Sequence, residues 1–274
     1  MMQAPDIGGM IFRHTADSHV VELPWGEWRL PTGWTLFGVD ISPTKHVVFM
    51  FLAAVLVWLT VFSAGRSNQK RHRDGKGPAG FGAAVEAVAL FVRDDVAIAN
   101  IGHNGRKFAP YILTLFFFVL YCNLLGLIPF GSTPTGNIVV TGTLAILTFL
   151  ITEISGFFAL GPKGYLKTIV FVPPGMKGLG AVAMALLMTP IELISKLVKP
   201  FALCLRLFAN MTAGHFVILA LLGLIFLFGS WAVAAGSVAF VLFMMCLELL
   251  VAFLQAYIFA LLTSVFIGML QHEH

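Results

Sequence analysis

Residues 181–228 read AVAMALLMTPIELISKLVKPFALCLRLFANMTAGHFVILALLGLIFLF, an apolar stretch that would be about 70 Å long as one helix. A second apolar stretch, residues 232–270, follows directly and would be about 60 Å long. The hydrocarbon core of a bilayer is only about 30 Å thick. Each stretch is therefore expected to be broken or strongly tilted. Pro190 and Pro200 could kink the first, whereas the second contains no proline, which favours tilt.

The composition of the 274-residue chain is that of a membrane protein. Hydrophobic residues make up 58% and charged residues 11%, against about 45–50% and about 25% in soluble domains. A chain this apolar is suited to a lipid bilayer rather than to water. The net charge of +4 is more informative about topology than about nucleic acid, which we do not expect as a partner. Cys122, Cys204 and Cys246 lie singly in apolar runs, so we expect neither a metal nor another cofactor.

Hydropathy and charge predict the order of the elements. Residues 1–45 mix tryptophan with proline and predict an irregular outer-side segment, followed by a first membrane helix at 46–64. Residues 65–107 predict a cytoplasmic basic loop and an amphipathic helix at 81–101, which would lie on the inner surface or pack on a partner. Positive residues beside a membrane helix tend to stay in the cytoplasm, which puts the N-terminus outside. The basic residues are Arg66, Lys70, Arg71, Arg73 and Lys76.

Two further spans are expected at 108–127 and 138–160, joined by an uncharged outer loop. Lys163, Lys167 and Lys177 then mark an inner loop. With the last two stretches folded as a hairpin, the C-terminus lies in the cytoplasm. The expected fold is an all-α integral membrane protein with about five membrane helices, the last two forming a long, strongly tilted hairpin, plus one amphipathic interfacial helix.

Ionisable groups within membrane segments are costly and usually mark a pathway or a coupling site. In this chain they gather in the last two stretches, where Asn210 and Gln255 add polarity without charge: Glu192, Lys196, Lys199, Arg206, His215 and Glu248. At about 100° per residue, four of these polar residues fall in one narrow stripe of a continuous helix. They are Glu192, Lys199, Arg206 and Asn210.

A hairpin turning at residues 229–231 pairs residues whose numbers have a nearly constant sum. Arg206 then lies at the depth of Gln255, and His215 lies at the depth of Glu248, nearer the outer side. Nine residues separate Arg206 from His215, so the two need not line one wall. Histidine and glutamate in a wet cavity can pass protons. Arginine cannot be deprotonated, so its fixed charge repels protons and attracts an ionised carboxylate.

Structural roles remain open for the same residues. The ammonium groups of Lys196 and Lys199 are expected to snorkel to the inner interface. Glu153, inside the third span, could pair with a basic group near the end of its helix and is left unassigned. The spacing alone also allows His215 and Glu248 to form a purely structural buried pair. Arg206 faces Glu192 only about four turns away, which favours a partner from another chain.

Several runs resemble subunit a of F-type ATP synthases. The most specific is KPFALCLRLFANMTAGH at 199–215, which is similar to the family's run ending in L-R-L-F-x-N-x-x-A-G. Supporting runs are PIE at 190–192, NLLGLIP at 123–129 and LQAYIF at 254–259. The resemblance extends from residue 108 to the C-terminus and implies that residues 108–274 form a channel domain facing a ring of c subunits.

The resemblance implies a role for each candidate proton-translocation residue. Arg206 would face the c-ring with Gln255 beside it, and Asn210 lies on the same stripe. His215 and Glu248 would line the outer half-channel, and Glu192 would line the inner one. Some relatives carry the acid and the histidine in the reverse order, which keeps the chemistry of the pair. Asn137 lies in an outer loop where some relatives carry an acid, so its role is left open.

The resemblance further implies a proton-channel stator that couples proton flow to rotation and does no bond chemistry itself. Its partners would be the c-ring, b-type peripheral stalk subunits, the rest of the ATP synthase and the lipid bilayer, and the expected location is a bacterial inner membrane. One alternative is a transporter with Arg206 binding an anionic substrate, but no internal repeat supports it. A structural scaffold is the other, and it leaves Arg206 and Glu248 unexplained.

Overall fold

The computed structural model describes residues 17–23, 26–33, 35–36, 39–40, 42–75, 77, 79–128, 131–169 and 179–272, together with Gly9. Several residues named above lie outside these ranges. They are Lys76 and Lys177, which bear on the predicted topology, and Pro129, the last residue of the NLLGLIP run.

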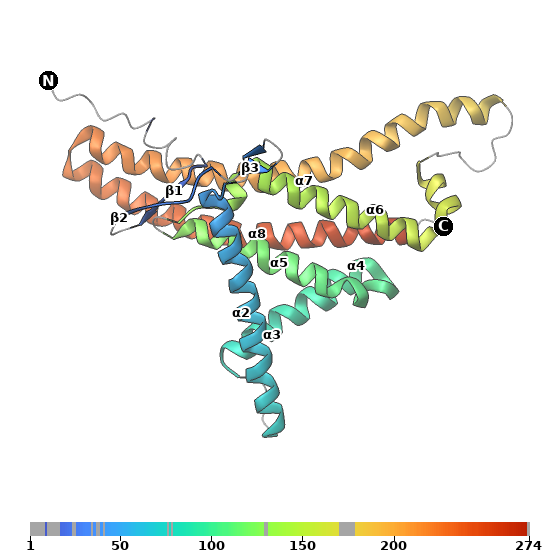
Figure 1. Ribbon diagram of the computed structural model, residues 1–274, viewed down its shortest axis with the longest axis horizontal. Helices are drawn as coiled ribbons and strands as arrows, with labels where there is room; N and C mark the ends of the chain where they lie inside the picture. Colours follow the sequence, from blue (N-terminus) through green and yellow to red (C-terminus); the bar gives the residue numbers. More distant parts are fainter. Residues whose placement is uncertain are drawn as a thin grey trace. The chain divides into compact units, whose positions relative to one another are not determined.

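Within the described residues, five helical segments are long and apolar enough to cross a membrane. They are α2 (Lys45–Arg73), the segment Phe81–Leu127, α6 (Ile138–Ile169), α7 (Leu179–Phe228) and α8 (Trp231–His272). The segment Phe81–Leu127 consists of α3 (Phe81–Phe91), a π-helical stretch η1 (Val92–Ile98), α4 (Ala99–Ile101), a 3₁₀ turn η2 (Gly102–Asn104) and α5 (Gly105–Leu127). A further 3₁₀ turn, η3 (Pro134–Gly136), precedes α6. Figure 1 shows the long helices with their labels. The all-α class with about five membrane helices is confirmed.

The N-terminal segment differs from its prediction as irregular chain. β1 (Val20–Leu23) pairs antiparallel with β2 (Gly26–Arg29), and β3 (Thr35–Leu36) pairs antiparallel with β4 (Val39–Asp40). The prediction is therefore wrong for these residues. β-branched and aromatic residues favour strands, and this preference acts here over only two to four residues, too few to be read beside so many prolines and tryptophans.

Helix boundaries also differ from the predicted ones. α2 continues to Arg73, so its basic residues lie on the last turns of the helix instead of in a loop. α7 is one continuous helix with Pro190 and Pro200 inside it, and α8 follows after Gly229 and Ser230. Gly229 has a φ of 56°, and its N–H donates to the carbonyl of Ile225. A glycine just past the helix end takes this left-handed conformation without a Cβ clash.

The chain divides into two units, each described here by itself. Unit 1 comprises Met1–Val85, Phe117–Val140 and Leu207–Tyr257. Unit 2 comprises Glu86–Phe116, Thr141–Arg206 and Ile258–His274. The helices α5, α6, α7 and α8 therefore each contribute to both units.

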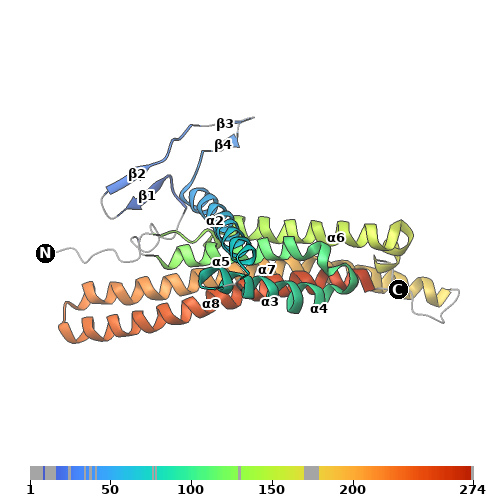
Figure 2. The same ribbon diagram turned by 90° about the horizontal axis from the view of Figure 1, so that it is seen from below.

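In unit 1, α2 packs on the last part of α5. Ala53, Cys122 and Leu125 form a buried cluster, and the hydroxyl groups of Thr60 and Tyr121 share a hydrogen bond of 2.5 Å. In the same unit, the end of α7 and the start of α8 run antiparallel and side by side (Figure 2). This hairpin carries several of the candidate residues.

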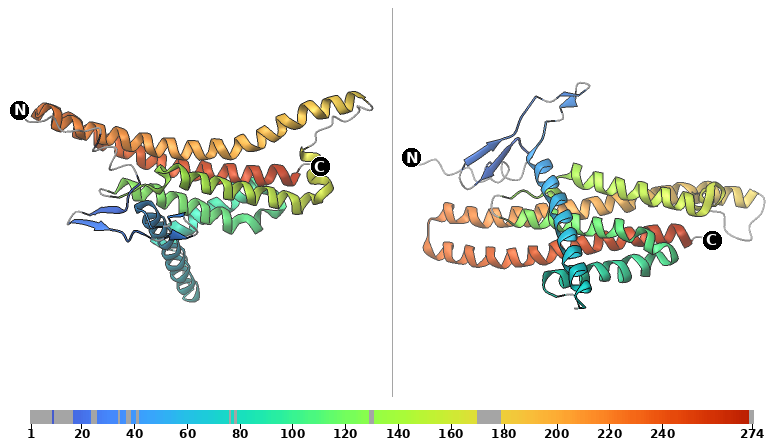
Figure 3. Two further views of the ribbon diagram at one scale, coloured as in Figure 1. Left: turned by 45° about the horizontal axis from the view of Figure 1, so that its top comes forward. Right: turned by 60° about the horizontal axis from the view of Figure 1, so that its bottom comes forward.

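In unit 2, close helix contacts occur at glycines. A Cβ on Gly268 would lie 2.0 Å from the carbonyl oxygen of Asn100, and one on Gly156 would lie 3.1 Å from the Cβ of Leu270. The Tyr111 and Thr148 hydroxyl groups meet at 3.2 Å and join α5 to α6. α6 is interrupted at Gly161, which has a φ of 68°, and its last part turns back (Figure 3). The break lies directly after residue 160, where the third span is predicted to end.

Helices α7 and α8 are poorly covered by the rest of the chain. Only 11% of the most apolar window of α7 is buried, and 22% of that of α8, against 56% for Phe81–Leu127. Their exposed faces are apolar, with Phe201 61% and Leu250 63% exposed. These two helices therefore have faces suited to lipid or to another protein.

Candidate functional site

His215 on α7 and Glu248 on α8 lie against each other across the hairpin of unit 1. The distance from His215 Nδ1 to Glu248 Oε1 is 3.5 Å. The side chain of Glu248 is 6% exposed and that of His215 is 20% exposed. The structure thus brings together the two residues that the sequence predicts to lie at the same depth of the hairpin. A buried acid and a base of this kind can hold one proton between them.

The 3.5 Å contact is not a hydrogen bond, and the buried His215 Nδ1 has no hydrogen-bond partner among the described residues. Glu248 Oε2 is buried and has no hydrogen-bond partner among the described residues. Gly214 makes room for the carboxylate, because a Cβ at this position would lie 2.8 Å from Glu248 Oε1. Buried carboxylate oxygens are normally hydrogen-bonded. This oxygen therefore keeps its capacity to accept a hydrogen bond.

Asn210 and Gln255 form a second contact in the same hairpin. Asn210 Nδ2 donates to Gln255 Oε1 at 3.0 Å. Gln255 is 2% exposed, and its Nε2 has no hydrogen-bond partner in the part of the chain that the structure describes. The sequence predicts Gln255 at the depth of Arg206. In unit 1 its side chain accepts a hydrogen bond from Asn210, which lies one turn after position 206 on α7.

Asn123 braces α8 against α5 in unit 1. Its Nδ2 donates to the Ala252 carbonyl at 3.3 Å, and its Oδ1 accepts from Thr135 at 2.7 Å. Asn123 and Thr135 are both fully buried. The sequence offers Asn123 only as part of the NLLGLIP run, and no periodicity predicts a partner so distant in the chain.

A polar cluster in unit 1 was not predicted from the sequence. His46, which is 4% exposed, lies 3.8 Å from Asp17 Oδ1 through its Nε2, and its Nδ1 is 3.0 Å from Ser132 Oγ. Asn137 Nδ2 donates to Asp17 Oδ2 at 3.3 Å, and Asn137 Oδ1 accepts from the Val139 N–H at the start of α6. Asn137 therefore helps to begin α6 and holds an acidic side chain of the N-terminal segment.

Arg206 belongs to unit 2 and is exposed on α7. It makes no ion pair with any described residue, including Glu192. Its neighbours Phe201 and Leu205 are exposed as well, at 61% and 37%. An arginine on an apolar helix surface is costly in a bilayer unless it has a partner or water.

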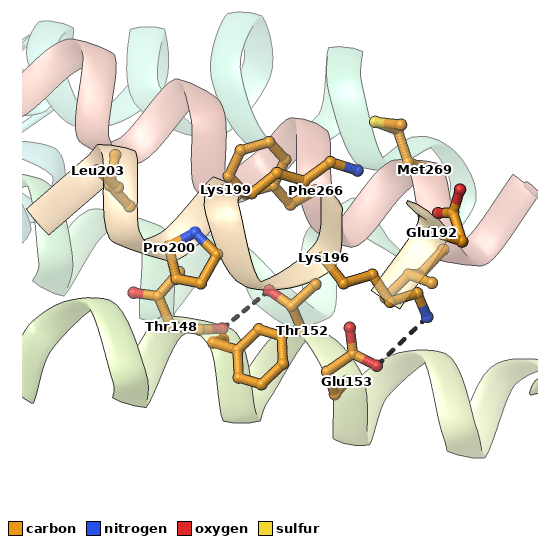
Figure 4. Close-up of a pocket in the computed structure, with 12 residues that line it drawn as sticks. Thr148, Thr152, Glu153, Glu192, Lys196, Lys199, Pro200, Leu203, Phe266 and Met269 are labelled. Carbon is orange, nitrogen blue, oxygen red and sulfur yellow. Dashed lines mark hydrogen bonds and ion pairs between the residues drawn. The ribbon is translucent and has the colours of Figure 1, made fainter. Parts of the chain in front are cut away.

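Glu192 lines a pocket in unit 2 between α6, α7 and α8 (Figure 4). The cavity of about 40 Å³ has room for more than one water molecule, since one needs about 10–15 Å³. Its charged residues are Glu153, Glu192, Lys196 and Lys199, and its polar ones include Thr148 and Thr152. Among the described residues, Glu192 makes neither an ion pair nor a hydrogen bond.

Lys196 does not snorkel as predicted. Its side chain is 9% exposed, and its Nζ lies 3.6 Å from Glu153 Oε2 and 3.0 Å from Thr168 Oγ1. The prediction is wrong because α6 supplies a half-buried carboxylate and a hydroxyl group close to the ammonium group, so the lysine need not reach an interface. This contact also gives Glu153 its partner, which sequence reasoning left unassigned. Lys199 points its ammonium group over the ring of Phe266, at 5.6 Å.

The apolar helices and their ionisable groups define a multi-pass helical membrane protein with polar sites on its last two helices. Residues 47–268 match the family of ATP synthase A chains. The chain belongs to this family, whose members are the a subunits of the Fo sector of ATP synthase.

Bacterial relatives agree with this membership. The chain is 48% identical over 262 residues to ATP synthase subunit a of Chloroherpeton thalassium, covering 95% of this chain and 76% of the relative. It is 47% identical over 264 residues to ATP synthase subunit a 2 of Chlorobaculum tepidum, covering 96% and 72%. It is 48% identical over 243 residues to ATP synthase subunit a of Myxococcus xanthus, covering 86% and 76%.

Proposed function

We propose that the chain is the proton-channel stator of an F-type ATP synthase in a bacterial inner membrane. It would offer two offset half-channels to a rotating ring of c subunits and so couple proton flow to rotation. It would do no bond chemistry, since ATP is made elsewhere in the complex. The N-terminus would lie in the periplasm and the C-terminus in the cytoplasm, with b-type stalk subunits holding the chain in place.

Arg206 carries the proposal. It is a permanent cation on an exposed apolar helix, and no described residue pairs with it. Such a charge is expected to meet a carboxylate supplied by another chain. A carboxylate on the rotor would fit, because it must be ionised while it passes the stator and neutral while it faces lipid.

The outer half-channel would use His215 and Glu248. Their 3.5 Å contact and the open oxygen of Glu248 support a path in which a proton is held by the pair and then released toward the rotor. Asn210 and Gln255 would line the same wall, with the free Nε2 of Gln255 available to a carboxylate or to water. Imidazole is well suited to this task because it titrates near neutral pH.

The inner half-channel would end at Glu192. Its carboxylate lines a pocket with room for water and has no partner among the described residues. After nearly a full turn, a protonated rotor site would lose its proton toward Glu192 and the cytoplasm. Arg206 would then hold the ionised site and prevent a direct leak between the two half-channels.

The test is Arg206→Ala in inverted membrane vesicles that carry the assembled complex. ATP synthesis should fall to background, because nothing then attracts the ionised rotor carboxylate, and passive proton permeability should rise. Arg93→Ala is a matched control, since Arg93 is exposed and, within the part of the chain that the structure describes, pairs only with the neighbouring Asp94. Coupled ATP synthesis near the wild-type rate in Arg206→Ala would overturn the proposal.

A further inference from the structure

The pocket of unit 2 holds two carboxylates and two ammonium groups, yet only one close ion pair forms among them. Lys196 lies four residues after Glu192 on α7, which is the favourable orientation for an ion pair along a helix. The structure does not use this pair. Figure 4 shows the ammonium group of Lys196 directed toward Glu153 and away from the carboxylate of Glu192.

Three groups of α6 hold Lys196 in this position. Glu153 Oε2 lies 3.6 Å from Lys196 Nζ, and Thr168 Oγ1 lies 3.0 Å from it. The ring of Tyr165 lies under the ammonium group at 4.9 Å. The hydroxyl group of Tyr165 also donates to Glu153 Oε2, which fixes the carboxylate.

The break at Gly161 makes this arrangement possible. Its φ of 68° turns the last part of α6 back, so that Tyr165 and Thr168 approach the same lysine as Glu153, which lies before the break. A straight helix would carry residues 153 and 168 about 22 Å apart along its axis. The bend therefore brings together groups that the sequence separates.

We infer that Glu153 is a counter-ion that keeps Lys196 away from Glu192 and so leaves Glu192 free to take up and release protons. Glu153, Tyr165 and Thr168 are positioning residues in this scheme and take no part in the transfer of protons. A carboxylate paired with an ammonium group takes up a proton less readily than a free one. The inference rests on the proposed role of Glu192 in the inner half-channel and deepens it.

No other charged group that lines the pocket pairs with Glu192. α7 contributes Lys199, whose ammonium group lies over Phe266. α6 contributes Glu153, which forms an ion pair with Lys196, and Tyr165, whose hydroxyl group donates to Glu153 and whose ring lies under the Lys196 ammonium group. α8 contributes only apolar residues to the pocket, which are Phe266, Met269 and Leu270.

The test compares Glu153→Gln with Glu153→Gln/Lys196→Gln in vesicles, with rates normalised to the amount of assembled complex. In Glu153→Gln, Lys196 is released and pairs with Glu192. ATP-driven proton pumping, which takes protons from the inner side, should fall about tenfold at neutral pH, and its pH profile should shift to lower pH by about one unit. Removing the lysine as well should restore the wild-type rate and profile.

A structural role for Glu153 predicts a different result. An unpaired buried lysine would lower the amount of complex but would leave the pH profile of the assembled complex unchanged. A wild-type profile in Glu153→Gln, or an acid shift that Lys196→Gln does not reverse, would overturn the inference. In a Glu192→Gln background, Glu153→Gln should produce no further shift.

Thr168→Val covers the case in which Glu153→Gln does not assemble. This variant keeps both charges and removes the 3.0 Å bond from Lys196 Nζ, together with the 2.8 Å bond that Thr168 Oγ1 donates to the Tyr165 carbonyl, so it should give a smaller shift in the same direction. No shift with Thr168→Val would then count against the inference. The proposed stator function is judged separately, since it fails only if Arg206→Ala keeps coupled synthesis.

Discussion

The His215–Glu248 contact in unit 1 and the Lys196–Glu153 contact in unit 2 have almost the same length, 3.5 Å and 3.6 Å. Both join two helices, and the carboxylate is buried in the first and half-buried in the second, with Glu248 6% and Glu153 15% exposed. In the first, the partner is an imidazole that can be neutral, and His215 Nδ1 and Glu248 Oε2 both lack a hydrogen-bond partner among the described residues. In the second, the partner is an ammonium group, and hydrogen bonds from Tyr165 to Glu153 and from Lys196 to Thr168 add to the ion pair.

The difference separates two uses of a carboxylate between helices. An ion pair with further hydrogen bonds holds its charges in place, because moving a proton would break several interactions at once. A partly bonded acid beside a weak base can change its protonation state at a smaller cost. Two carboxylates without a hydrogen-bond partner at Glu248 Oε2 and at Glu192, among the described residues, are therefore better candidates for proton transfer than the bonded carboxylate of Glu153.

The largest effect is expected from Glu248→Gln. An amide cannot hold a transferable proton, so ATP synthesis should fall by about 100-fold, the size of a lost acid–base group. The measurement is ATP synthesis and ATP-driven pumping by the assembled complex across pH. Glu248→Asp, which keeps the acid, should retain part of the activity. Unchanged rates in Glu248→Gln would make the pair structural and would remove the contrast with Lys196–Glu153.

Exchanging the partners tests the two contacts against each other. His215→Glu/Glu248→His keeps one acid and one base in the hairpin and should restore much of the activity that either single change removes. Glu153→Lys/Lys196→Glu also keeps its pair, but it puts a glutamate four residues from Glu192, where like charges repel. This second exchange should remain impaired in proton pumping. Equal rescue of both would show that the identity of the base and the position of the charge do not matter.

Sequence reasoning reached one of these contacts and missed the other for a physical reason. His215 and Glu248 lie on two helices joined by a short turn, so the position of the turn alone sets which residues meet. Glu153 and Lys196 lie on helices joined by a longer connection, and their meeting depends on helix packing that no periodicity encodes.

The same limit applies elsewhere in the molecule. Hydropathy located the five apolar helical segments of the described residues, but not the extension of α2 or the four short strands found there. Local composition identifies long periodic elements better than short ones. No ion-pair partner of Arg206 could be derived from the sequence, because no described residue of this chain pairs with the guanidinium group.

A moderate effect is expected from Gly214→Ala. The added Cβ would lie 2.8 Å from Glu248 Oε1 and push the carboxylate away from His215, at a cost of about 1–3 kcal/mol for overpacking. Proton pumping should fall several-fold, less than in Glu248→Gln. Gly236→Ala on α8 is the matched control, because, apart from the backbone of its own helix and its chain neighbours, no described atom lies within 4 Å of its added Cβ. An equal loss in both variants would mean that helix glycines as such matter, and not the fit around Glu248.

The smallest effect on proton transfer is expected from Thr135→Val. It removes the 2.7 Å bond to Asn123 and leaves a buried amide oxygen without its donor, which costs about 1–3 kcal/mol. Asn123 also bonds to the Ala252 carbonyl, one turn after Glu248 on α8, so the loss weakens the support of that helix without touching its acid. The purified complex should lose this chain at a lower temperature, while the pH profile of pumping stays as in the wild type. A shifted profile would mean that the brace between α5 and α8 belongs to the proton path, and that satisfied and unsatisfied polar groups cannot be separated by role in this protein.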